Sequence, residues 1–318
     1  MKISGFTMSR NATKLYYPAK QSIASILPIV DEFVVALGKS DEDDRTLEEI
    51  KSLNSDKIRI IHTVWDTEKY PRGMEHAHQT DIAKEACTGD WCFYLQADEV
   101  VHERYLDTIV EACNRYVDDK EVEGFLFKYK HFYGDYEHYN DRYGWYPREI
   151  RIVRNDPEIH SFISAQSFRR IPNFDGVSYR NKEGTHKLGV LPIDAEIYHY
   201  GWVRPPWLMQ RKRKAFHTIH KGKQAAERTY KERQEYFDYG ALADLAEFKE
   251  THPKVMQEVI DQFNWREYLH YEKGYKPNRE LQKHETPRVR FLSFLQDTFF
   301  GGKPLPFVGY SNWKILKR

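Results

Sequence analysis

The chain has 318 residues, 40% of them hydrophobic, which is enough to bury the core of one large domain or of a domain with an extension. Its formal charge of +1, from 49 basic and 48 acidic residues, argues against a protein that binds nucleic acid with its whole surface. No apolar run is long enough to span a bilayer, and the first residues lack the apolar stretch of a signal peptide. We therefore expect a cytoplasmic protein without a nucleic-acid partner.

Strands and helices alternate through the first hundred residues. Continuous apolar runs of strand length are followed by segments in which apolar residues recur at helical spacing. The expected strands lie at residues 3–7, 33–37, 58–64 and 90–95, and the expected helices begin near Pro18, Thr46 and Glu75. This alternation predicts an α/β fold, with a mainly parallel sheet flanked by helices.

The pattern changes after an amphipathic helix that ends near Val117. Further strands are expected at residues 125–133, 150–154 and 194–200, and the first two are separated by an aromatic stretch that carries acids. Helical spacing then dominates up to a tail rich in phenylalanine. We therefore divide the chain into a domain, residues 1–203, with halves 1–100 and 101–203, and a mostly helical extension, residues 204–318.

Cysteines and neighbouring histidines do not predict a metal cluster. Cys87, Cys92 and Cys113 are too few and wrongly spaced for a disulfide framework or a zinc site, so we expect buried free thiols. His76 and His78 are two residues apart on an expected helix and therefore point in different directions.

The strand at residues 90–95 leads directly to two adjacent carboxylates, Asp98 and Glu99. Acids at the carboxyl end of a buried parallel strand lie where open α/β sheets bind ligands. Their hard oxygen atoms suit Mg²⁺ or Mn²⁺ bound against a diphosphate. The simpler alternative is that both acids only cap the helix that begins near His102.

Several motifs in the first two hundred residues resemble nucleotide-sugar glycosyltransferases of the GT-A fold, most closely family 2. The matching segments are the polar turn Arg10-Asn11, the loop Gly38-Lys39-Ser40 with Asp44-Arg45-Thr46, the pair Gly89-Asp90, and Gln96-Ala97-Asp98-Glu99 in place of an Asp-x-Asp motif. Two positions depart from the pattern, because Leu37 and Gln96 stand where that family has acids. The resemblance implies a Rossmann-like nucleotide-binding half.

The resemblance also implies a donor site and a metal site. The donor would be a nucleotide sugar, UDP- or GDP-linked, and its expected contacts are Asn11, Ser40, Asp44, Arg72, Gln96, Ala97 and Asp98. A divalent cation, Mn²⁺ or Mg²⁺, would be held by Asp98, with Glu99 and His199 as further ligands. Such a cation neutralises the charge that develops on the departing phosphate. The alternative for His199 is that it only packs beside Tyr198 and Tyr200.

An inverting transfer needs a carboxylate that accepts the proton of the attacking acceptor hydroxyl. Glu149 is the first candidate, because it precedes a strand in the region where the resembled family has its acceptor-side base. Asp135, Glu137 and Asp141 are alternatives on a loop rich in tyrosine. The simpler interpretation of each is an ordinary loop carboxylate. The expected acceptor is a glycan or a glycolipid, as in polysaccharide biosynthesis.

A basic run and an aromatic tail leave several interpretations open. The run comprises Arg204, Arg211, Lys212, Arg213, Lys214, Lys221 and Lys223. It fits a solvated helix face, a clamp on the leaving diphosphate, or a patch for anionic lipids at a peripheral membrane contact. We favour the solvated face, with one or two residues turned inward towards phosphate. The tail comprises Phe291, Phe294, Phe299, Phe300 and Phe307, for which we favour core packing over a membrane foot.

Two other classes of function remain as alternatives. A noncatalytic nucleotide- or sugar-binding module is suggested by Gln96, since an amide is a weaker ligand for a hard cation. A nucleotidyltransferase ranks last, because it would normally have a glycine-rich phosphate loop and residues 9–13 contain no glycine. The sequence leaves the oligomeric state open.

Overall fold

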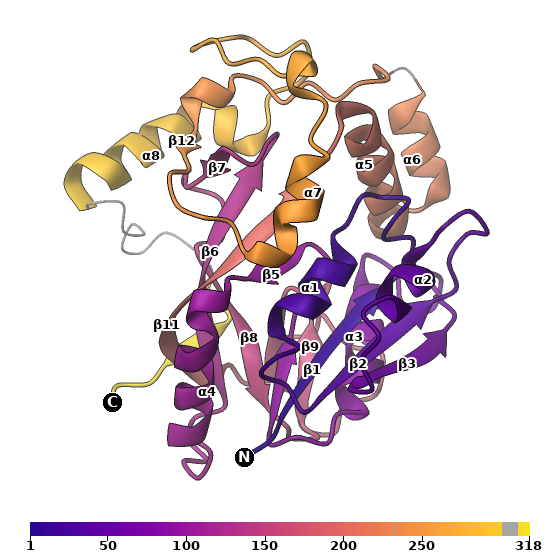
Figure 1. Ribbon diagram of the computed structural model, residues 1–318, viewed down its shortest axis with the longest axis vertical. Coiled ribbons are helices and arrows are strands. Elements are labelled where there is room, and N and C mark those ends of the chain that lie inside the picture. The colour runs from indigo at the N-terminus through magenta and orange to yellow at the C-terminus, as the bar shows by residue number, and fades with distance from the viewer. Residues whose placement is uncertain (232, 301–310) are drawn as a thin grey trace.

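The computed structural model describes residues 1–231, 233–300 and 311–318, without the side chains of residues 297 and 300. Its described strands form one large mixed sheet, in the order β12-β7-β6-β8-β4-β1-β2-β3 with β11, β5 and β13 attached, and a separate hairpin, β9 and β10. Helices flank the sheet, and the amino-terminal half forms one side of the molecule, at the lower right of the view (Figure 1). The predicted α/β class is confirmed.

The amino-terminal half is the parallel part of the sheet. It comprises β1 (Ile3–Ser9), α1 (Ala19–Ile26), β2 (Glu32–Gly38), α2 (Thr46–Lys51), β3 (Ile58–Thr63), α3 (Met74–Glu85) and β4 (Trp91–Tyr94). These elements agree with the predicted order. In β2, Phe33 and Val35 pack in one core cluster while Val34 packs in the other, so both faces of the strand are buried. This explains why its sequence is continuously apolar.

The second half adds antiparallel strands. It comprises β5 (Glu99–Val101), α4 (Leu106–Arg115), β6 (Gly124–Tyr133), β7 (His138–Asn140), β8 (Arg148–Arg154), β9 (Ile159–Phe162), β10 (Ser167–Arg170) and β11 (Leu188–Trp202). β8 runs antiparallel to both β4 and β6, whereas β11 runs parallel to β6 and antiparallel to β5. β11 has 15 residues, and a register shift after Pro192 lets it continue alongside β6 beyond the strand predicted at residues 194–200.

The residues after β4 do not cap a helix. Glu99 lies in β5 opposite His199, and the short 3₁₀ turn Glu103–Tyr105 before α4 is capped instead by the side chain of His102. The capping interpretation of the two acids is therefore wrong.

The remaining chain packs onto the same core. It comprises α5 (Pro206–Lys221), α6 (Lys223–Tyr230), β12 (Ala246–Glu247), α7 (Gln257–Asp261), α8 (Pro287–Phe300) and β13 (Trp313–Ile315), with 3₁₀ turns at Leu242–Asp244, Lys254–Met256, Arg266–Tyr268 and Lys283–Glu285. Phe237, Met256 and Trp265 share one hydrophobic cluster with Tyr133 of β6 and Tyr200 of β11. The described part of residues 204–318 is thus packed against the sheet rather than separate from it.

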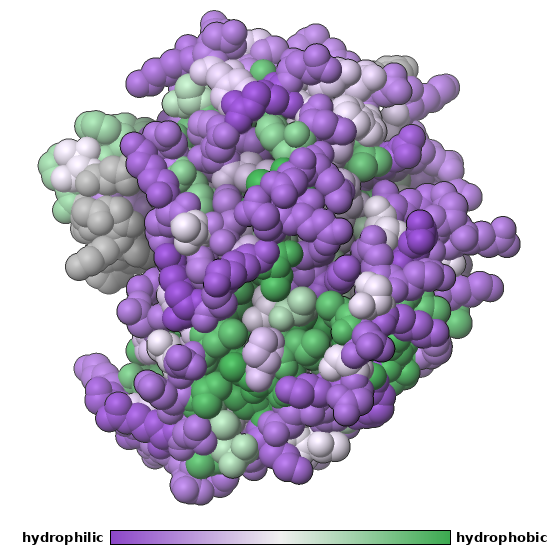
Figure 2. All heavy atoms as spheres, viewed as in Figure 1, coloured by the Kyte–Doolittle hydropathy of each residue, from purple (hydrophilic) through white to green (hydrophobic). Residues whose placement is uncertain are grey.

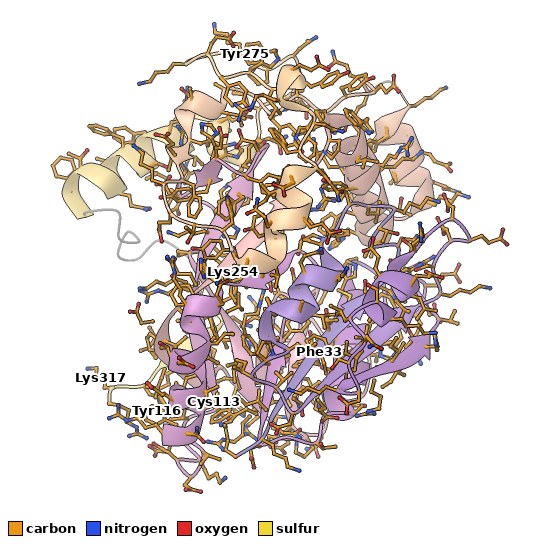
Figure 3. The ribbon with its side chains drawn as sticks, viewed as in Figure 1. Phe33, Cys113, Tyr116, Lys254, Tyr275 and Lys317 are labelled. Carbon is orange, nitrogen blue, oxygen red and sulfur yellow. The ribbon has the colours of Figure 1, made fainter. Side chains whose placement is uncertain are left out.

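The buried cysteines were predicted correctly, but the packing of the tail was not. All three thiols are free and buried, and Cys113 on α4 lies in the same core cluster as Phe33 (Figure 3). In contrast, Phe291, Phe294 and Phe299 on α8 are 60%, 58% and 69% exposed, so the expected core packing is wrong for them. The side chain of Phe300, and Phe307 as a whole, lie outside the described residues. None of the described helices has both the length and the hydropathy needed to cross a membrane.

Candidate active site

Asp98 lies at the carboxyl edge of the sheet, between β4 and β5, and is 7% exposed. Its backbone oxygen accepts a hydrogen bond from Tyr200 N at 2.8 Å, and its Oδ2 faces His199 Nε2 at 3.6 Å and Lys212 Nζ at 4.0 Å. Burial alone would raise the pKa of this carboxyl, but His199, Lys212 and Arg204 hold it well below its usual value. Asp98 is therefore an ionised carboxylate surrounded by basic side chains.

A second histidine, His131, fixes the orientation of His199. The two residues are neighbours on the parallel strands β6 and β11, and their Nδ1 atoms are 2.9 Å apart. His131 Nε2 lies 2.8 Å from the carbonyl oxygen of Tyr146, to which it donates, so that its Nδ1 must accept from His199 when the ring is neutral. Burial holds the pKa of His131 well below its usual value, so the ring is neutral.

It follows that His199 in its neutral form, the form that can bind a cation, carries its proton on Nδ1 and has an unprotonated Nε2, whereas the charged form donates from Nε2 towards Asp98. A hydrogen bond that fixes the tautomer of a ligating histidine is a common feature of protein metal sites. Sequence reasoning missed His131. The available signal was that two expected strands each carry a histidine close to the carboxyl end.

Gly201 leaves space in front of Asp98 Oδ2 and His199 Nε2. A Cβ atom at this position would lie 2.5 Å from Asp98 Oδ2 and 2.5 Å from His199 Nε2, closer than real Cβ contacts. One carboxylate oxygen and one imidazole nitrogen therefore border a space that a methyl group would fill. A set of one oxygen and one nitrogen donor suits Mn²⁺. Two protein ligands would leave the other coordination positions of the ion for phosphate oxygens and water. The residues fit a divalent cation.

Glu99 does not belong to this ligand pair. Its carboxylate is fully buried and binds Arg151 through two hydrogen bonds of 2.7 Å, while Tyr129 donates a third at 2.8 Å. The backbone N–H of Gln96 donates a fourth, at 3.1 Å. The expected role of Glu99 as a metal ligand is therefore corrected, because both of its oxygens are already paired. Instead it fixes the backbone on either side of Asp98.

Gln96 also has a structural partner. Its side-chain amide donates to the carbonyl oxygen of Ala165 at 2.8 Å, on the loop between β9 and β10. Ile163 and Ala165 in that loop have φ of 65° and 58°, a left-handed conformation that non-glycine residues seldom adopt. Ala97 is half-buried between Gln96 and Asp98. The amide that replaces the expected acid thus holds a strained loop beside Asp98, which the sequence did not predict.

The predicted donor contacts after β1 and β2 lie together. Asn11 N donates to Ser40 Oγ at 3.0 Å, and Asn11 Oδ1 accepts from the backbone N–H of Asp41 at 2.8 Å. Asp44 accepts from the hydroxyl of Thr13 at 2.6 Å, which joins the same two loops. The structure therefore brings Asn11, Ser40 and Asp44 to one edge of the sheet, where their mutual hydrogen bonds shape the loops.

Arg72, the remaining predicted donor contact, lies on the loop before α3. It is exposed, has a φ of 57°, and its carbonyl oxygen accepts from Arg180 at 3.3 Å. It is not part of the group around Asp98.

Two members of the basic run turn inward. Arg204 and Lys212 both donate to the carbonyl oxygen of Gly201, at 3.0 and 2.5 Å, and both lie over the ring of Tyr17. Burial, reinforced by Arg204, lowers the pKa of Lys212 to about 7. The other members are exposed, except for the half-buried Arg213, which packs over Phe237. The exposure of the other members agrees with the favoured solvated face, and Arg204 and Lys212 are the residues turned inward, while their orientation towards phosphate stays a prediction.

The candidate bases occupy different environments. Glu149 on β8 is 4% exposed, its Oε2 has no hydrogen-bond partner, and burial raises its pKa to about 7. Asp135 is fully buried and accepts from His138 and Tyr271, which marks it as structural. Glu137 pairs with Arg266 at the surface.

Asp141, an alternative candidate base, is exposed on the loop after β7. Burial raises the pKa of Glu149 towards neutrality, while Asp141 offers a carboxylate that solvent reaches on the tyrosine-rich loop.

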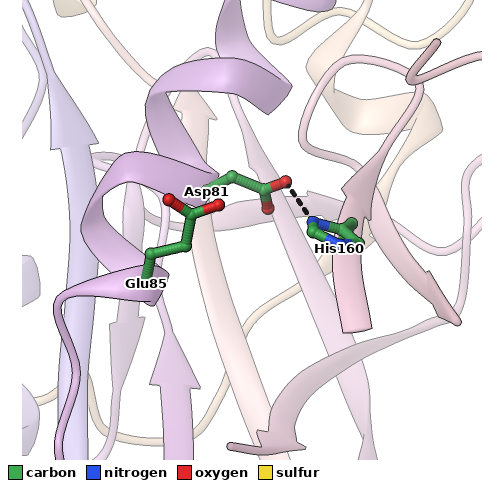
Figure 4. A group of neighbouring side chains, drawn as sticks. All are labelled: Asp81, Glu85 and His160. Carbon is green, nitrogen blue, oxygen red and sulfur yellow. Dashed lines mark hydrogen bonds and ion pairs between the residues drawn. The ribbon is translucent and has the colours of Figure 1, made fainter. Parts of the chain in front are cut away.

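Another group with possible ligand atoms lies on α3 and β9, and consists of Asp81, Glu85 and His160 (Figure 4). Asp81 Oδ2 pairs with His160 Nδ1 at 2.9 Å, and Asp81 Oδ1 accepts from Ser161 N at 2.7 Å. Since both oxygens of Asp81 already join the helix to the strand, we interpret this group as a structural link. His76 and His78 also have separate environments: His76 packs near His220, and His78 stacks on Tyr70.

No protein-family model and no curated protein matches the chain. Among solved structures, it is similar to S. aureus TarS 1-349, with 14% identity over 72% of each chain and a TM-score of 0.39. The UDP complex of TarS 1-349 has 12% identity over 71% of this chain and 69% of that one, with a TM-score of 0.37.

The chain is also similar to glucosyl-3-phosphoglycerate synthase from Mycobacterium tuberculosis, in complex with Mn²⁺, uridine diphosphate and phosphoglyceric acid. That likeness has 17% identity, a TM-score of 0.28, and covers 42% of this chain and 43% of that one.

Proposed function

We propose that the chain is a metal-dependent glycosyltransferase, which moves a sugar from a nucleotide-sugar donor to a glycan or glycolipid acceptor. The observation that carries this proposal is the pair of ligand atoms, Asp98 Oδ2 and His199 Nε2, 3.6 Å apart beside the space left by Gly201. These two residues would hold Mn²⁺ or Mg²⁺. When bound, the cation supplies positive charge that stabilises a departing nucleoside diphosphate.

The charges around Asp98 support an anionic ligand. Arg204 is fully buried and Lys212 is half-buried, its side chain 14% exposed, beside a single carboxylate, and a divalent ion would add two further positive charges. Buried cations are costly unless an anion compensates them. A nucleoside diphosphate carries the required negative charge, and both side chains are already directed toward this edge of the sheet by the carbonyl oxygen of Gly201.

An inverting reaction would further require a base. Glu149 is our first candidate, because a pKa near 7 suits proton transfer at neutral pH. Since its Oε2 is covered, the acceptor would have to displace neighbouring side chains to reach it. Asp141 is the alternative, because it is exposed on the loop that would meet an acceptor.

A noncatalytic binding module is the second candidate, favoured by Gln96, whose amide is already engaged with Ala165. A transfer assay separates the two functions. UDP- and GDP-sugars are incubated with Mn²⁺ and the protein, and release of the nucleoside diphosphate is measured with and without mixed glycan acceptors. Turnover should require the metal and be abolished by Asp98→Ala and by His199→Ala.

The matched control is Asp118→Ala, which removes an exposed carboxylate in the turn after α4. Thermal unfolding of every variant shows whether the fold is retained. A donor that raises the unfolding temperature but never turns over would favour the binding module. Equal turnover by wild type and Asp98→Ala would exclude the proposed metal site.

A further inference from the structure

Helix α8 buries a face of mixed polarity and exposes an aromatic one. Val289, Ser293 and Gln296 follow one face at helical spacing and are 6%, 6% and 8% exposed. Phe291 and Phe294 lie on the opposite side and are 60% and 58% exposed. A helix of a globular protein normally buries its apolar stripe. The exposed stripe therefore indicates a partner outside the described chain.

Specific contacts hold α8 in this orientation. Ser293 Oγ accepts from the backbone N–H of Tyr143 at 3.0 Å and donates to the carbonyl oxygen of Val289 at 2.9 Å. Arg290 forms an ion pair with Asp244. Rotating the helix to bury its phenylalanines would break both contacts, so the aromatic side stays outward. α8 projects from the body of the molecule (Figure 1), and apolar spheres gather over it at the edge of the view (Figure 2).

The size of the aromatic face favours a lipid surface over a second copy of the chain. With Phe299, 69% exposed in the last turn, the face has three phenylalanines. Because a phenylalanine buries about 150–250 Å² when covered, the three expose roughly 350 Å². A stable protein interface takes about 800 Å² from each partner. The face is thus too small for a stable dimer by itself, but it suits insertion of a few rings between lipid head groups.

The charges around the face favour anionic lipids. Lys283 lies just before α8 and Arg288 in its first turn, and both are exposed. Asp297 is the one acidic residue in the sequence of α8. Basic side chains beside exposed aromatic rings are typical of helices that lie on membrane surfaces.

We propose that α8 docks the protein on an anionic lipid bilayer by inserting Phe291, Phe294 and Phe299. The loop between β7 and β8 joins this helix to the site, because Tyr143 binds Ser293 while Tyr146 binds His131. A docked α8 would hold that loop close to the bilayer. A lipid-linked acceptor would then reach the site from the membrane, a consequence that rests on the proposed function.

Vesicle sedimentation tests the docking without any assay of activity. The full chain is mixed with vesicles of phosphatidylcholine containing phosphatidylglycerol, and with vesicles of phosphatidylcholine alone. We expect binding to the anionic vesicles, reduced more than about tenfold in the triple variant Phe291→Ser, Phe294→Ser, Phe299→Ser, because insertion depends on the buried apolar area. Arg288→Glu should weaken binding to anionic vesicles only.

The matched control is Tyr268→Ser with Ile315→Ser, which removes two exposed apolar side chains elsewhere (42% and 47%) and should bind as the wild type does. Equal binding by wild type and triple variant, or no binding by a folded wild type, would overturn the proposal. So would a dimer, detected by light scattering, that the triple variant abolishes, since the face would then be a protein interface. Release of nucleoside diphosphate in solution is measured separately. If the proposed activity fails, the vesicle-binding result can therefore still be interpreted.

Discussion

His131 Nδ1 lies 2.9 Å from Nδ1 of His199, and this hydrogen bond determines which nitrogen of His199 faces Asp98. Replacing His131 should therefore weaken metal binding although His131 is not a ligand. We expect His131→Phe to lower Mn²⁺ affinity by about 10- to 100-fold, the usual effect of losing such a partner. Calorimetric titration of Mn²⁺ in the presence of UDP measures this. His186→Phe, at an exposed histidine, is the control, and equal affinities for His131→Phe and wild type would contradict the tautomer assignment.

Gly201→Ala should block the metal site directly. The added methyl group would lie 2.5 Å from both Asp98 Oδ2 and His199 Nε2, so at least one ligand must move. Since the neighbouring atoms are side chains, the fold should survive with an unfolding temperature near that of wild type in the absence of metal. Mn²⁺ titration and thermal unfolding are measured on the same sample. Wild-type metal affinity in this variant would show that the cation binds elsewhere.

The ion pair between Arg151 and Glu99 should be important for stability. Both side chains are at most 1% exposed, and removing one partner leaves a buried charge without compensation. We expect Arg151→Ala to lower the free energy of unfolding by about 3–5 kcal/mol. Lys128→Ala breaks an exposed pair with Asp194 and should cost no more than about 1 kcal/mol. Urea denaturation of both variants tests the difference, and similar midpoints would refute it.

Glu149 should make the protein less stable as the pH rises. Burial raises its pKa to about 7, above the value of 4.5 for an unperturbed carboxyl, so between these values the folded state binds more protons than the unfolded state. Stability from this group is complete below about pH 4.5 and is lost as the pH rises to about 7. The full difference is roughly 3 kcal/mol.

Glu149→Gln cannot ionise and should remove this dependence. Its unfolding temperature, relative to that of wild type, should increase between pH 5 and pH 8. Glu158→Gln, at an exposed glutamate nine residues further along the chain, serves as the control. A constant difference between Glu149→Gln and wild type across this range would show that Glu149 is ionised throughout.

The parallel half of the fold could be predicted largely because β2 and β4 are buried on both faces, which leaves continuous apolar runs in the sequence. Asp98 followed from its place at the end of such a run. The role of Glu99 could not be predicted, since its partner Arg151 lies 52 residues away and the pairing depends on β8 running antiparallel to β4.

The outward face of α8 was missed for a related reason. Helical spacing identifies an apolar stripe but does not say whether that stripe meets the core or an external partner. The contact that decides the matter, between Ser293 and Tyr143, joins residues 150 apart in sequence. The strained loop at Ile163 and Ala165 likewise follows from the tertiary contact with Gln96 rather than from local preference.

The last strand of the chain is attached to the strand that carries His199. Trp313 and Ile315 of β13 pair with Leu188 and Val190 at the start of β11, and His199 lies toward the other end of the same strand. A purification tag fused after residue 318 would therefore lie close to a strand that is paired with β11. For surface-based binding measurements, attachment through engineered surface cysteines on α6 would keep the point of attachment away from that strand.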